Sequence, residues 1–391
     1  MQPGIDRRKF LKLGATASAL AVGCGSSKDG QPEGEAVVEM RYRPLGNTGL
    51  QVSEIAFGSA GFDNPALLEA ALDAGINTIS TGDNAGYGQA DEMIGEVISR
   101  LGSRRDQLIL CAGVVIKQGI SKQRILDSID TDLRRLRTDR LEVYRVGDLD
   151  SPDNLRIDSV HEAFEEARQA GKVMHLAVAG HSGGMQNCLN AAIDDGRFGA
   201  LFTKYDFVSY PDQDQILQRA AERGIGTVVF KVNAGNRQRE IRDLESGGLS
   251  FRQATIKWAL THPYVASVCV GFTNFDQIRE YTEAVSSQLS GAETAMLRRY
   301  AHEMYDQYCR FCGTCEGHCP NDVSIANVMR YAMYFKYYNR EKRAMALYQA
   351  LPDRRSASAC DQCPGQCGAG CPFGRHVQTE LAEAHRLLSF A

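Results

Sequence analysis

Between residues 41 and about 290, the chain alternates short apolar runs with longer amphipathic stretches. Eight of the short runs have the length and composition of strands: Glu54–Gly58, Asn77–Thr81, Leu108–Gly113, Leu141–Val146, Met174–Ala179, Ala200–Tyr205, Gly226–Lys231 and Ser267–Gly271. Apolar residues recur at helical spacing between them, for instance over Pro65–Ala74, Ser121–Leu136, Ser159–Ala170 and Phe251–Thr261. Eight strand–helix repeats in about 250 residues are what a closed barrel of parallel strands requires. We therefore expect an α/β fold with a (β/α)8 TIM barrel over residues 41–290.

The cysteines are concentrated beyond this region, where two similar runs each end in a Cys-Pro pair. The first run is Cys309, Cys312, Cys315 and Cys319, and the second is Cys360, Cys363, Cys367 and Cys371. The second run has one extra residue before its third cysteine. In this spacing three thiolates wrap one iron–sulfur cube, while the cysteine before the proline ligates the other cluster. The pattern predicts two 4Fe-4S clusters, one on Cys309, Cys312, Cys315 and Cys371, and the other on Cys360, Cys363, Cys367 and Cys319.

Two other uses of these cysteines remain open. Disulfides would be allowed if the protein is exported, but a bridge within Cys-x2-Cys is strained. A structural zinc ion takes four thiolates, and a Cys-x2-Cys pair could supply two of them. Neither use explains the proline after the last cysteine of both runs, so the sequence favours the clusters.

The residues between the two cysteine runs have a helical pattern, and we expect residues 291–391 to form a small α-helical domain. Its apolar positions are Ile325, Val328, Met329, Ala332, Met333 and Phe335, then Ala344, Leu347 and Tyr348. This segment resembles the helical ferredoxin domain of respiratory electron carriers. Four tyrosines alternate here with four cations: Tyr331, Tyr334, Tyr337 and Tyr338 with Lys336, Arg340, Lys342 and Arg343. Such a stretch could dock an acidic redox partner, or could be a helix that packs its rings and solvates its charges.

The N-terminus has the pattern of an export signal. Arg7 and Arg8 precede a short apolar run that is too short to span a bilayer, which is typical of a twin-arginine signal over residues 1–24. A frayed basic N-terminus is the alternative. Cys24 lies in a sequence that resembles a lipoprotein cleavage box, so it could carry a lipid anchor, be removed with the signal or remain an exposed thiol. Residues 25–40 are expected to be a flexible tether, and the protein to be exported to the periplasm or anchored to the membrane facing it.

The segment Arg41–Ser53, which reads RYRPLGNTGLQVS, resembles the opening of the aldo/keto reductase family. Ala70–Asn77, His262-Pro263 and Val270-Gly271 are similar to later landmarks of that family, so the resemblance covers Arg41 to about Ser290. A subgroup of the family also carries a C-terminal cluster domain. The resemblance implies carbonyl reduction by a nicotinamide hydride, with an Asp, a Tyr, a Lys and a His at the barrel mouth. The Tyr donates the proton, and the Lys lowers its pKa.

Only the tyrosine of that tetrad is matched here, by Tyr87. The other three positions are occupied by Ser80, Gly113 and Gly147. The family reaction should therefore be lost or very slow, unless nearby loop residues re-create the arrangement: Lys117, Asp83, Asp148 or His181. The alternative, which the sequence favours for each of the four, is an ordinary loop residue. His181 is the best candidate among them because it follows a strand end and precedes Gly183-Gly184.

The family's nucleotide site is also altered. Ala177–Ser182 replaces its Ser-Asn pair, and Phe202 replaces a glutamine. The signature after the last strand is better kept, and the resemblance assigns cofactor binding to Gly271, Thr273, Asn274, Gln277 and Glu280, with Tyr281 in place of the closing Asn. Backbone amides at a helix N-terminus would there hold a phosphate. NADP binding is possible, but the altered positions and an extracytoplasmic location weigh against it.

The net charge of -4 gives no case for nucleic acid as a partner. Three hypotheses remain, with the redox partner or substrate and the enzyme status open. The chain is an oxidoreductase or electron carrier whose clusters relay electrons to a ligand at the barrel mouth, a catalytically inactive scaffold, or an active NADPH-dependent carbonyl reductase with a rebuilt site. A pocket containing Tyr87, His181 and Lys231 close to a cluster would favour catalysis, whereas a filled mouth would favour the scaffold. Cys111, Cys188 and Cys269 are expected to be buried apolar thiols.

Overall fold

The computed structural model describes residues 39–81, 88–147, 151–181, 184–208, 213–235, 238–245, 247–305 and 307–389. Residues 39–391 belong to one compact unit. The predicted signal, Cys24 and most of the predicted tether lie outside the described residues. At the end of that tether, however, Met40 is buried against the barrel core, so the folded unit begins slightly earlier than predicted. No helix in the described part of the chain is long and apolar enough to span a membrane.

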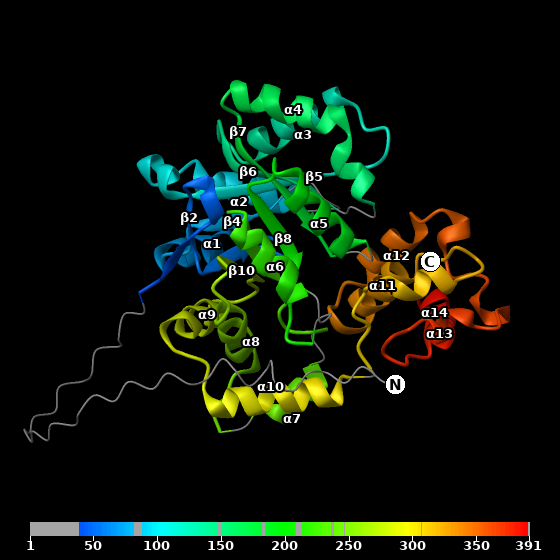
Figure 1. The fold of residues 1–391 in the computed structure, drawn as a ribbon. Helices are drawn as coiled ribbons and strands as arrows, with labels where there is room; N and C mark the ends of the chain where they lie inside the picture. Colours follow the sequence, from blue (N-terminus) through cyan, green and yellow to red (C-terminus); the bar gives the residue numbers. More distant parts are fainter. Residues whose placement is uncertain are drawn as a thin grey trace, which may run out of the picture. The chain divides into compact units, whose positions relative to one another are not determined.

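A closed barrel of eight parallel strands forms the centre of this unit (Figure 1). The strands are β3 (Ile55–Gly58), β4 (Thr78–Ser80), β5 (Ile109–Val115), β6 (Leu141–Gly147), β7 (Val173–Gly180), β8 (Ala200–Lys204), β9 (Gly226–Phe230) and β10 (Ser267–Gly271). They pair in chain order, and β10 closes the ring on β3. All eight predicted strands and the TIM barrel are confirmed. β5 continues two residues beyond its predicted end at Gly113, so Gly113 lies inside the strand.

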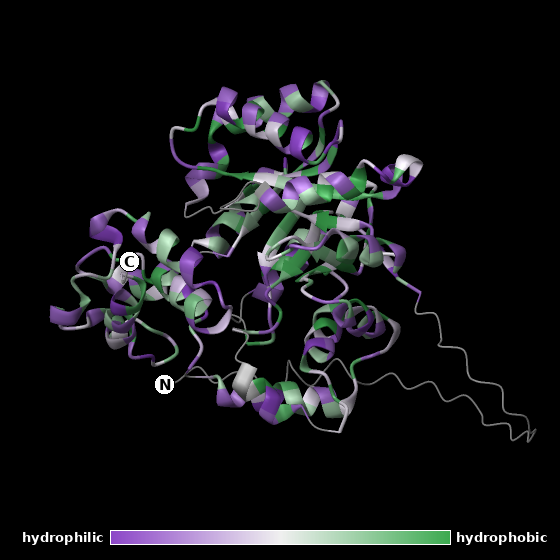
Figure 2. Ribbon diagram, turned by 180° about the vertical axis from the view of Figure 1, so that it is seen from behind, coloured by the Kyte–Doolittle hydropathy of each residue, from purple (hydrophilic) through white to green (hydrophobic). Residues whose placement is uncertain are grey.

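Helices surround the strands and cover their apolar outer faces. They are α1 (Pro65–Asp73), α2 (Gly88–Ile98), α3 (Lys122–Arg135), α4 (Asp158–Gln169), α5 (Met185–Asp195), α6 (Gln213–Glu222), α7 (Gln238–Leu244), α8 (Phe251–Leu260) and α9 (Asp276–Ser286). Local sequence sets their starts, because Asn64, Ser121 and Ser250 each accept a hydrogen bond from an amide of the first turn. Figure 2 shows the result as hydrophobic strands enclosed by helices with hydrophilic outer faces.

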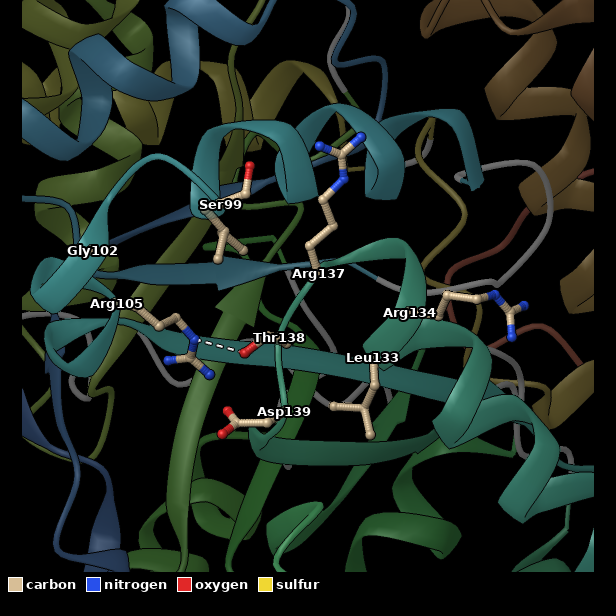
Figure 3. Close-up of a pocket in the computed structure, with 9 residues that line it drawn as sticks. Ser99, Gly102, Arg105, Leu133, Arg134, Arg137, Thr138 and Asp139 are labelled. Carbon is tan, nitrogen blue, oxygen red and sulfur yellow. Dashed lines mark hydrogen bonds between the residues drawn. The ribbon is translucent and has the colours of Figure 1, made fainter.

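The N-terminal end of the barrel is closed by a hairpin and fixed by a buried ion pair. The hairpin is β1 (Tyr42–Pro44) with β2 (Gln51–Ser53), and Leu45 after β1 is fully buried beneath the strands. Arg105 and Glu142 form an ion pair of 3.0 Å with both side chains buried. Figure 3 shows Arg105 beside an open depression at this end, where its Nε donates to Thr138 at 2.9 Å. In such barrels the N-terminal face serves stability, so this depression is not the candidate site.

The C-terminal hundred residues are helical, as predicted from the spacing of their apolar residues. The helices are α10 (Gly291–Glu303), α11 (Ile325–Tyr337), α12 (Glu341–Gln349), α13 (Gln366–Ala369) and α14 (Val377–Leu388). α11 packs on α12 and α14. A single hydrophobic cluster joins this segment to the barrel, and it includes Phe251 of α8 against Tyr300 of α10 at 4.8 Å between ring centroids. The barrel and the helical segment therefore share a core.

Candidate functional site

A cavity of about 970 Å³ lies at the mouth of the barrel. Its floor is formed by the C-terminal ends of the strands, including Gly58, Ser80, Gly147, Gly180 and Gly271. Active sites of TIM-barrel enzymes are built at this end of the strands. The volume lies within the range of small-molecule sites, so the mouth is open rather than filled.

The second wall of the cavity comes from α11, α12 and the connection between them. Arg330, Tyr334 and Lys336 line it from α11, and Arg343 and Leu347 line it from α12. This is the segment in which tyrosines alternate with cations. From the sequence, this segment could be either a surface that docks a partner protein or a helix with packed rings and solvated charges. In the structure, many of its tyrosines and cations instead line the cavity at the barrel mouth.

The lining of the cavity carries positive charge from both walls. The cations are Arg145, Lys231, Arg252, Arg330, Lys336, Arg340 and Arg343. Among the described residues that line the cavity there is no Asp or Glu. Two of these cations pair with acids outside the cavity lining: Lys336 with Glu383 at 2.6 Å and Arg252 with Glu280 at 3.7 Å.

His181 directly follows β7 and lies in the cavity, as the sequence predicted. One of its ring nitrogens, Nδ1, lies 2.5 Å from Nη1 of Arg330, and its ring meets the edge of Phe230 at 5.7 Å. Burial lowers the pKa of His181 well below its usual value, and the nearby Lys231, Arg330 and Arg343 lower it further. The imidazole is therefore neutral at physiological pH: Nδ1 accepts from the guanidinium, and Nε2 carries the hydrogen.

Lys231 follows β9 and reaches across to the second wall. Its Nζ donates to the hydroxyl of Tyr334 at 2.6 Å and lies 4.6 Å from the centre of that ring. Its backbone is left-handed, with φ of 59°. Non-glycine residues adopt this conformation rarely, and such positions are concentrated at functional sites.

The structure covers the implied tetrad only in part. Tyr87 and the nearby Asp83 lie outside the described residues, as does Asp148. Ser80 and Gly147 line the cavity at the ends of their strands, but Gly113 does not. Lys117 is exposed and does not line the cavity.

Gly113 cannot be the place of a lysine in this barrel. A Cβ at this position would lie 2.3 Å from the carbonyl oxygen of Arg145 on the paired strand β6. The cation at this place in the mouth is Arg145 itself, whose guanidinium donates to the carbonyl oxygens of Thr81 and, at 3.2 Å, Cys111. It also lies 5.0 Å from the centre of the Phe202 ring. Sequence reasoning missed Arg145, although a lone arginine within the apolar run Leu141–Val146 was a signal for it.

Three of the five predicted nucleotide-binding residues line the cavity: Gly271, Thr273 and Gln277. Two amides near the start of α9 already have side-chain partners. Thr273 N donates to Oε1 of Gln277 at 2.7 Å, and Gln277 N donates to Oδ1 of Asn274 at 3.1 Å. A phosphate at this site would have to displace these side chains. Glu280 instead accepts from the Ser250 hydroxyl at 2.6 Å, and Asn274 and Glu280 do not line the cavity.

The eight clustered cysteines lie in two groups that each mix the two runs. Burial raises the pKa of Cys315, and the neighbouring Cys309, Cys312 and Cys371 raise it further. In the same way burial, then Cys319, Cys367 and Cys363, raise the pKa of Cys360 to about 12. None of the eight is in a disulfide. Over the described residues, no three His, Cys, Asp or Glu side chains are placed to hold a single metal ion.

Local backbone conformation brings the first group together. Phe311 and Gly313 are left-handed, with φ of 56° and 76°, so the chain curls between its first cysteines. Cys309, Cys312, Cys315 and Cys371 line one small cavity. Its opposite side is formed by α11, through Ile325, Ala326 and Met329.

Of the three barrel cysteines predicted to be buried apolar thiols, Cys111 and Cys188 are confirmed, whereas Cys269 differs. Cys111 of β5 and Cys188 of α5 are buried. Burial raises the pKa of Cys111 to about 12, which makes its thiol inert at physiological pH. Cys269 of β10 is partly buried and lines the barrel cavity.

Comparison with known proteins connects the barrel to one family. The aldo/keto reductase family profile matches residues 55–245. An uncharacterised oxidoreductase of Bacillus subtilis, YrpG, is 25% identical over 66% of this chain and 95% of its own length. The 6-dehydroglucose reductase of Novosphingobium aromaticivorans is 26% identical over 62% of this chain and 90% of its own length. The structure of aldo-keto reductase AKR11C1 from Bacillus halodurans in its holo form superposes with a TM-score of 0.56 at 23% identity, over 67% of this chain and 96% of that one. The sequence matches therefore connect residues 55–245 to the aldo/keto reductase family, and the structural match shows the same barrel fold.

Proposed function

We propose that this chain is an oxidoreductase in which a ligand binds at the barrel mouth beside two 4Fe-4S clusters held by the C-terminal helical segment. The observation that carries the proposal is the position of α11. Its residues Ile325, Ala326 and Met329 face the first group of cysteines, while Arg330 and Tyr334 face the barrel cavity. The two sites are therefore separated by about the diameter of one helix, ~10 Å, which is short enough for electron transfer between them.

The donor set fits the clusters. Eight thiols form two groups of four, and each group combines three cysteines of one run with the last cysteine of the other. A single zinc ion would hold its four sulfurs close together, whereas a cube takes one thiolate at each of four separated irons. The amide of Val323 donates to Sγ of Cys319 at 3.4 Å, and hydrogen bonds of this kind to ligand sulfurs tune cluster potentials. When bound, the two clusters would supply one-electron transfer.

The barrel supports a site that binds a ligand rather than a scaffold. The cavity is open, and two of the residues expected in a working site, His181 and Lys231, line it. The neutral His181 can donate its Nε2 hydrogen into the cavity. Arg145 adds a cation to the cavity lining, and its guanidinium is held by backbone carbonyl oxygens. A nicotinamide nucleotide is not part of the proposal, because the family's nucleotide-binding positions are altered in this sequence and two amides near the start of α9, those of Thr273 and Gln277, already bind side chains.

The proposal predicts the result of an anaerobic reductive titration. Dithionite should bleach the cluster absorbance near ~400 nm, whereas NADPH should leave it unchanged, since the nucleotide site is altered. The measurement is an absorbance titration of the full-length protein with its iron and sulfide contents determined. Iron and sulfide well below about eight of each per chain would contradict the two clusters. Bleaching by NADPH would instead support the nicotinamide-dependent reductase.

We also propose that the twin-arginine pair directs export of the folded protein, a route that suits cofactors inserted in the cytoplasm. Replacing Arg7 and Arg8 together by lysine should leave the protein in the cytoplasm, as measured by fractionation of the producing cells. Arg41→Lys, which keeps the charge at a position outside the predicted signal, serves as the control. Unchanged export of the double variant would contradict the signal. Membrane attachment that is lost in Cys24→Ser would show that Cys24 carries lipid.

A further inference from the structure

Arg310 is a buried arginine beside the first group of cysteines. It is 7% exposed and lines the same small cavity as those four thiols. Its Nε donates to the carbonyl oxygen of Val208 at 2.8 Å, and its guanidinium carbon lies 3.7 Å from the ring centre of Phe373. The connection after β8 and the ring that follows Cys371 therefore fix the guanidinium next to the cysteines.

The positive charge of Arg310 is not neutralised by a bonded acid. Among the described residues, Arg310 forms no ion pair, and its buried Nη1 has no hydrogen-bond partner. Asp206 lies nearby, but its carboxylate forms the ion pair of 3.0 Å with Lys204. Burial lowers the pKa of Arg310, and nearby groups, Cys309 among them, raise it partly back, so the guanidinium remains charged. A buried cation without a partner is costly, and in native proteins such a group has a reason, a redox role among them.

Other charges beside the first group have opposite charges bonded to them. Arg375 lines the same cavity and forms an ion pair with Glu380. Glu316 accepts from the amide of Ala326 at 2.9 Å, in the first turn of α11. The positive end of the helix dipole offsets the charge of Glu316 there. The charge that remains around the first group is therefore that of Arg310.

The second group, which consists of Cys319, Cys360, Cys363 and Cys367, has an acid beside it instead. Burial and the neighbouring thiols raise the pKa of Cys360, and the charge of Asp361 raises it further. Asp361 pairs with Arg386 at 2.8 Å, but both side chains are more than half exposed. Water screens an exposed pair of this kind, so Arg386 is no counterpart of the buried Arg310.

The other features that set cluster potentials do not separate the two groups. The Thr314 hydroxyl donates to Sγ of Cys312 at 3.3 Å, and the Val323 amide donates to Sγ of Cys319 at 3.4 Å, so each group has a hydrogen bond to sulfur. Each group also combines buried with partly buried cysteines. The difference between the groups is therefore one of charge.

Reduction of a 4Fe-4S cluster adds one electron and one negative charge, and no bond is made or broken. A fixed cation beside the cluster stabilises the reduced state and so raises the reduction potential. We infer that Arg310 raises the reduction potential of the first cluster above that of the second, so that electrons from an external one-electron donor pass from the second group to the first, toward the barrel cavity. The inference rests on the proposed function and adds the direction of electron flow.

A redox titration of the full-length protein tests the inference. Samples are reduced anaerobically with dithionite to stepped potentials and examined by electron paramagnetic resonance. The first cluster should be reduced before the second, and Cys319→Ser, which should retain only the first cluster, identifies its spectrum. A second cluster that is reduced first would overturn the inference, and this comparison requires no change at Arg310.

Substitution of Arg310 tests the cause. Arg310→Gln should lower the potential of the first cluster and leave that of the second unchanged, whereas Arg310→Lys keeps the charge and should retain most of the potential. The matched control is Arg386→Gln, which removes a positive charge of the same segment at a side chain that is 57% exposed. It should leave the potential of the first cluster unchanged. No shift in Arg310→Gln, or equal shifts in Arg310→Gln and Arg386→Gln, would contradict the inference.

Two further measurements separate this inference from the proposed function. Circular dichroism with iron and sulfide analysis shows whether each variant is folded and retains both clusters. Iron and sulfide well below about eight of each in the unsubstituted protein would contradict the proposed function and this inference with it. Two clusters that are reduced in the opposite order would contradict this inference alone.

Discussion

If the proposed two clusters are present, replacing Cys319 by serine is expected to remove about half of the iron, and the lost half should be the cluster of the second cysteine run. The reason is the crossed grouping, in which Cys319 of the first run lies with Cys360, Cys363 and Cys367. A cube that loses one thiolate is poorly held, so about four of eight irons should be lost per chain. Iron and sulfide analysis of the purified variant, with spectroscopy of the reduced cluster that remains, measures the effect.

Paired substitutions distinguish crossed ligation from ligation within each run. Cys319→Ser combined with Cys363→Ser should lose no more iron than Cys319→Ser alone, because both residues serve one cluster. Cys319→Ser combined with Cys312→Ser should lose both clusters. The reverse pattern would show that each run holds its own cluster. Cys188→Ala, in a barrel helix outside both groups, is the control and should retain all the iron.

Asp206→Asn is expected to destabilise the protein by about 3–5 kcal/mol, because it leaves a buried ammonium without its carboxylate. Lys204 and Asp206 form an ion pair of 3.0 Å at the end of β8, with side chains 3% and 0% exposed. The Lys204 ammonium also lies 5.0 Å from the ring centre of Tyr308, the residue before Cys309. Denaturation followed by circular dichroism and by the ~400 nm absorbance should show that the fold and the proposed first cluster are lost at a lower denaturant concentration than in the unsubstituted protein.

Two variants identify the cause of that loss. Glu69→Gln breaks the exposed ion pair with Arg100, in which the side chains are 46% and 59% exposed, and should cost less than about 1 kcal/mol. Lys204→Met combined with Asp206→Asn removes the stranded charge and should recover most of the stability. If the double variant is as unstable as Asp206→Asn, the loss of stability comes from packing or from the hydrogen bond that Val208 N donates to Asp206 at 2.9 Å, and not from the unpaired ammonium.

The barrel could be predicted because the sequence patterns that specify its strands and helices each lie within a single element. Apolar runs of strand length, helical spacing and capping residues such as Ser121 and Ser250 lie within single elements, and all eight strands appeared where they were predicted. The end of β5 was misplaced because its continuation, Val114 and Val115, looks like any apolar pair. The grouping of the cysteines was predictable for a similar reason, since the spacing within each run already implies which thiol points away.

The cavity was not predictable in the same way, because its two walls are far apart in the sequence. Arg330 and His181 touch although 149 residues separate them, and no local pattern encodes that meeting. The alternation of tyrosines and cations was noticed, but sequence alone could not say whether it faced solvent, a partner or the barrel. The positions of Ser80 and Gly147 were predicted correctly, yet the arginine that occupies the mouth beside them, Arg145, was overlooked.

Helix α11 contributes to both the barrel cavity and the cavity lined by the first group of cysteines, and this affects comparison with relatives. Proteins that match about two thirds of this chain along nearly their whole length leave about a third of it without a counterpart, and the barrel accounts for what they match. A substrate assignment inferred from such relatives would consider only the barrel wall of the cavity and would leave out the wall formed by α11 and α12. Substrate assignment for chains of this kind should therefore begin with the residues that α11 and α12 present to the barrel, and only then consider the strands beneath them.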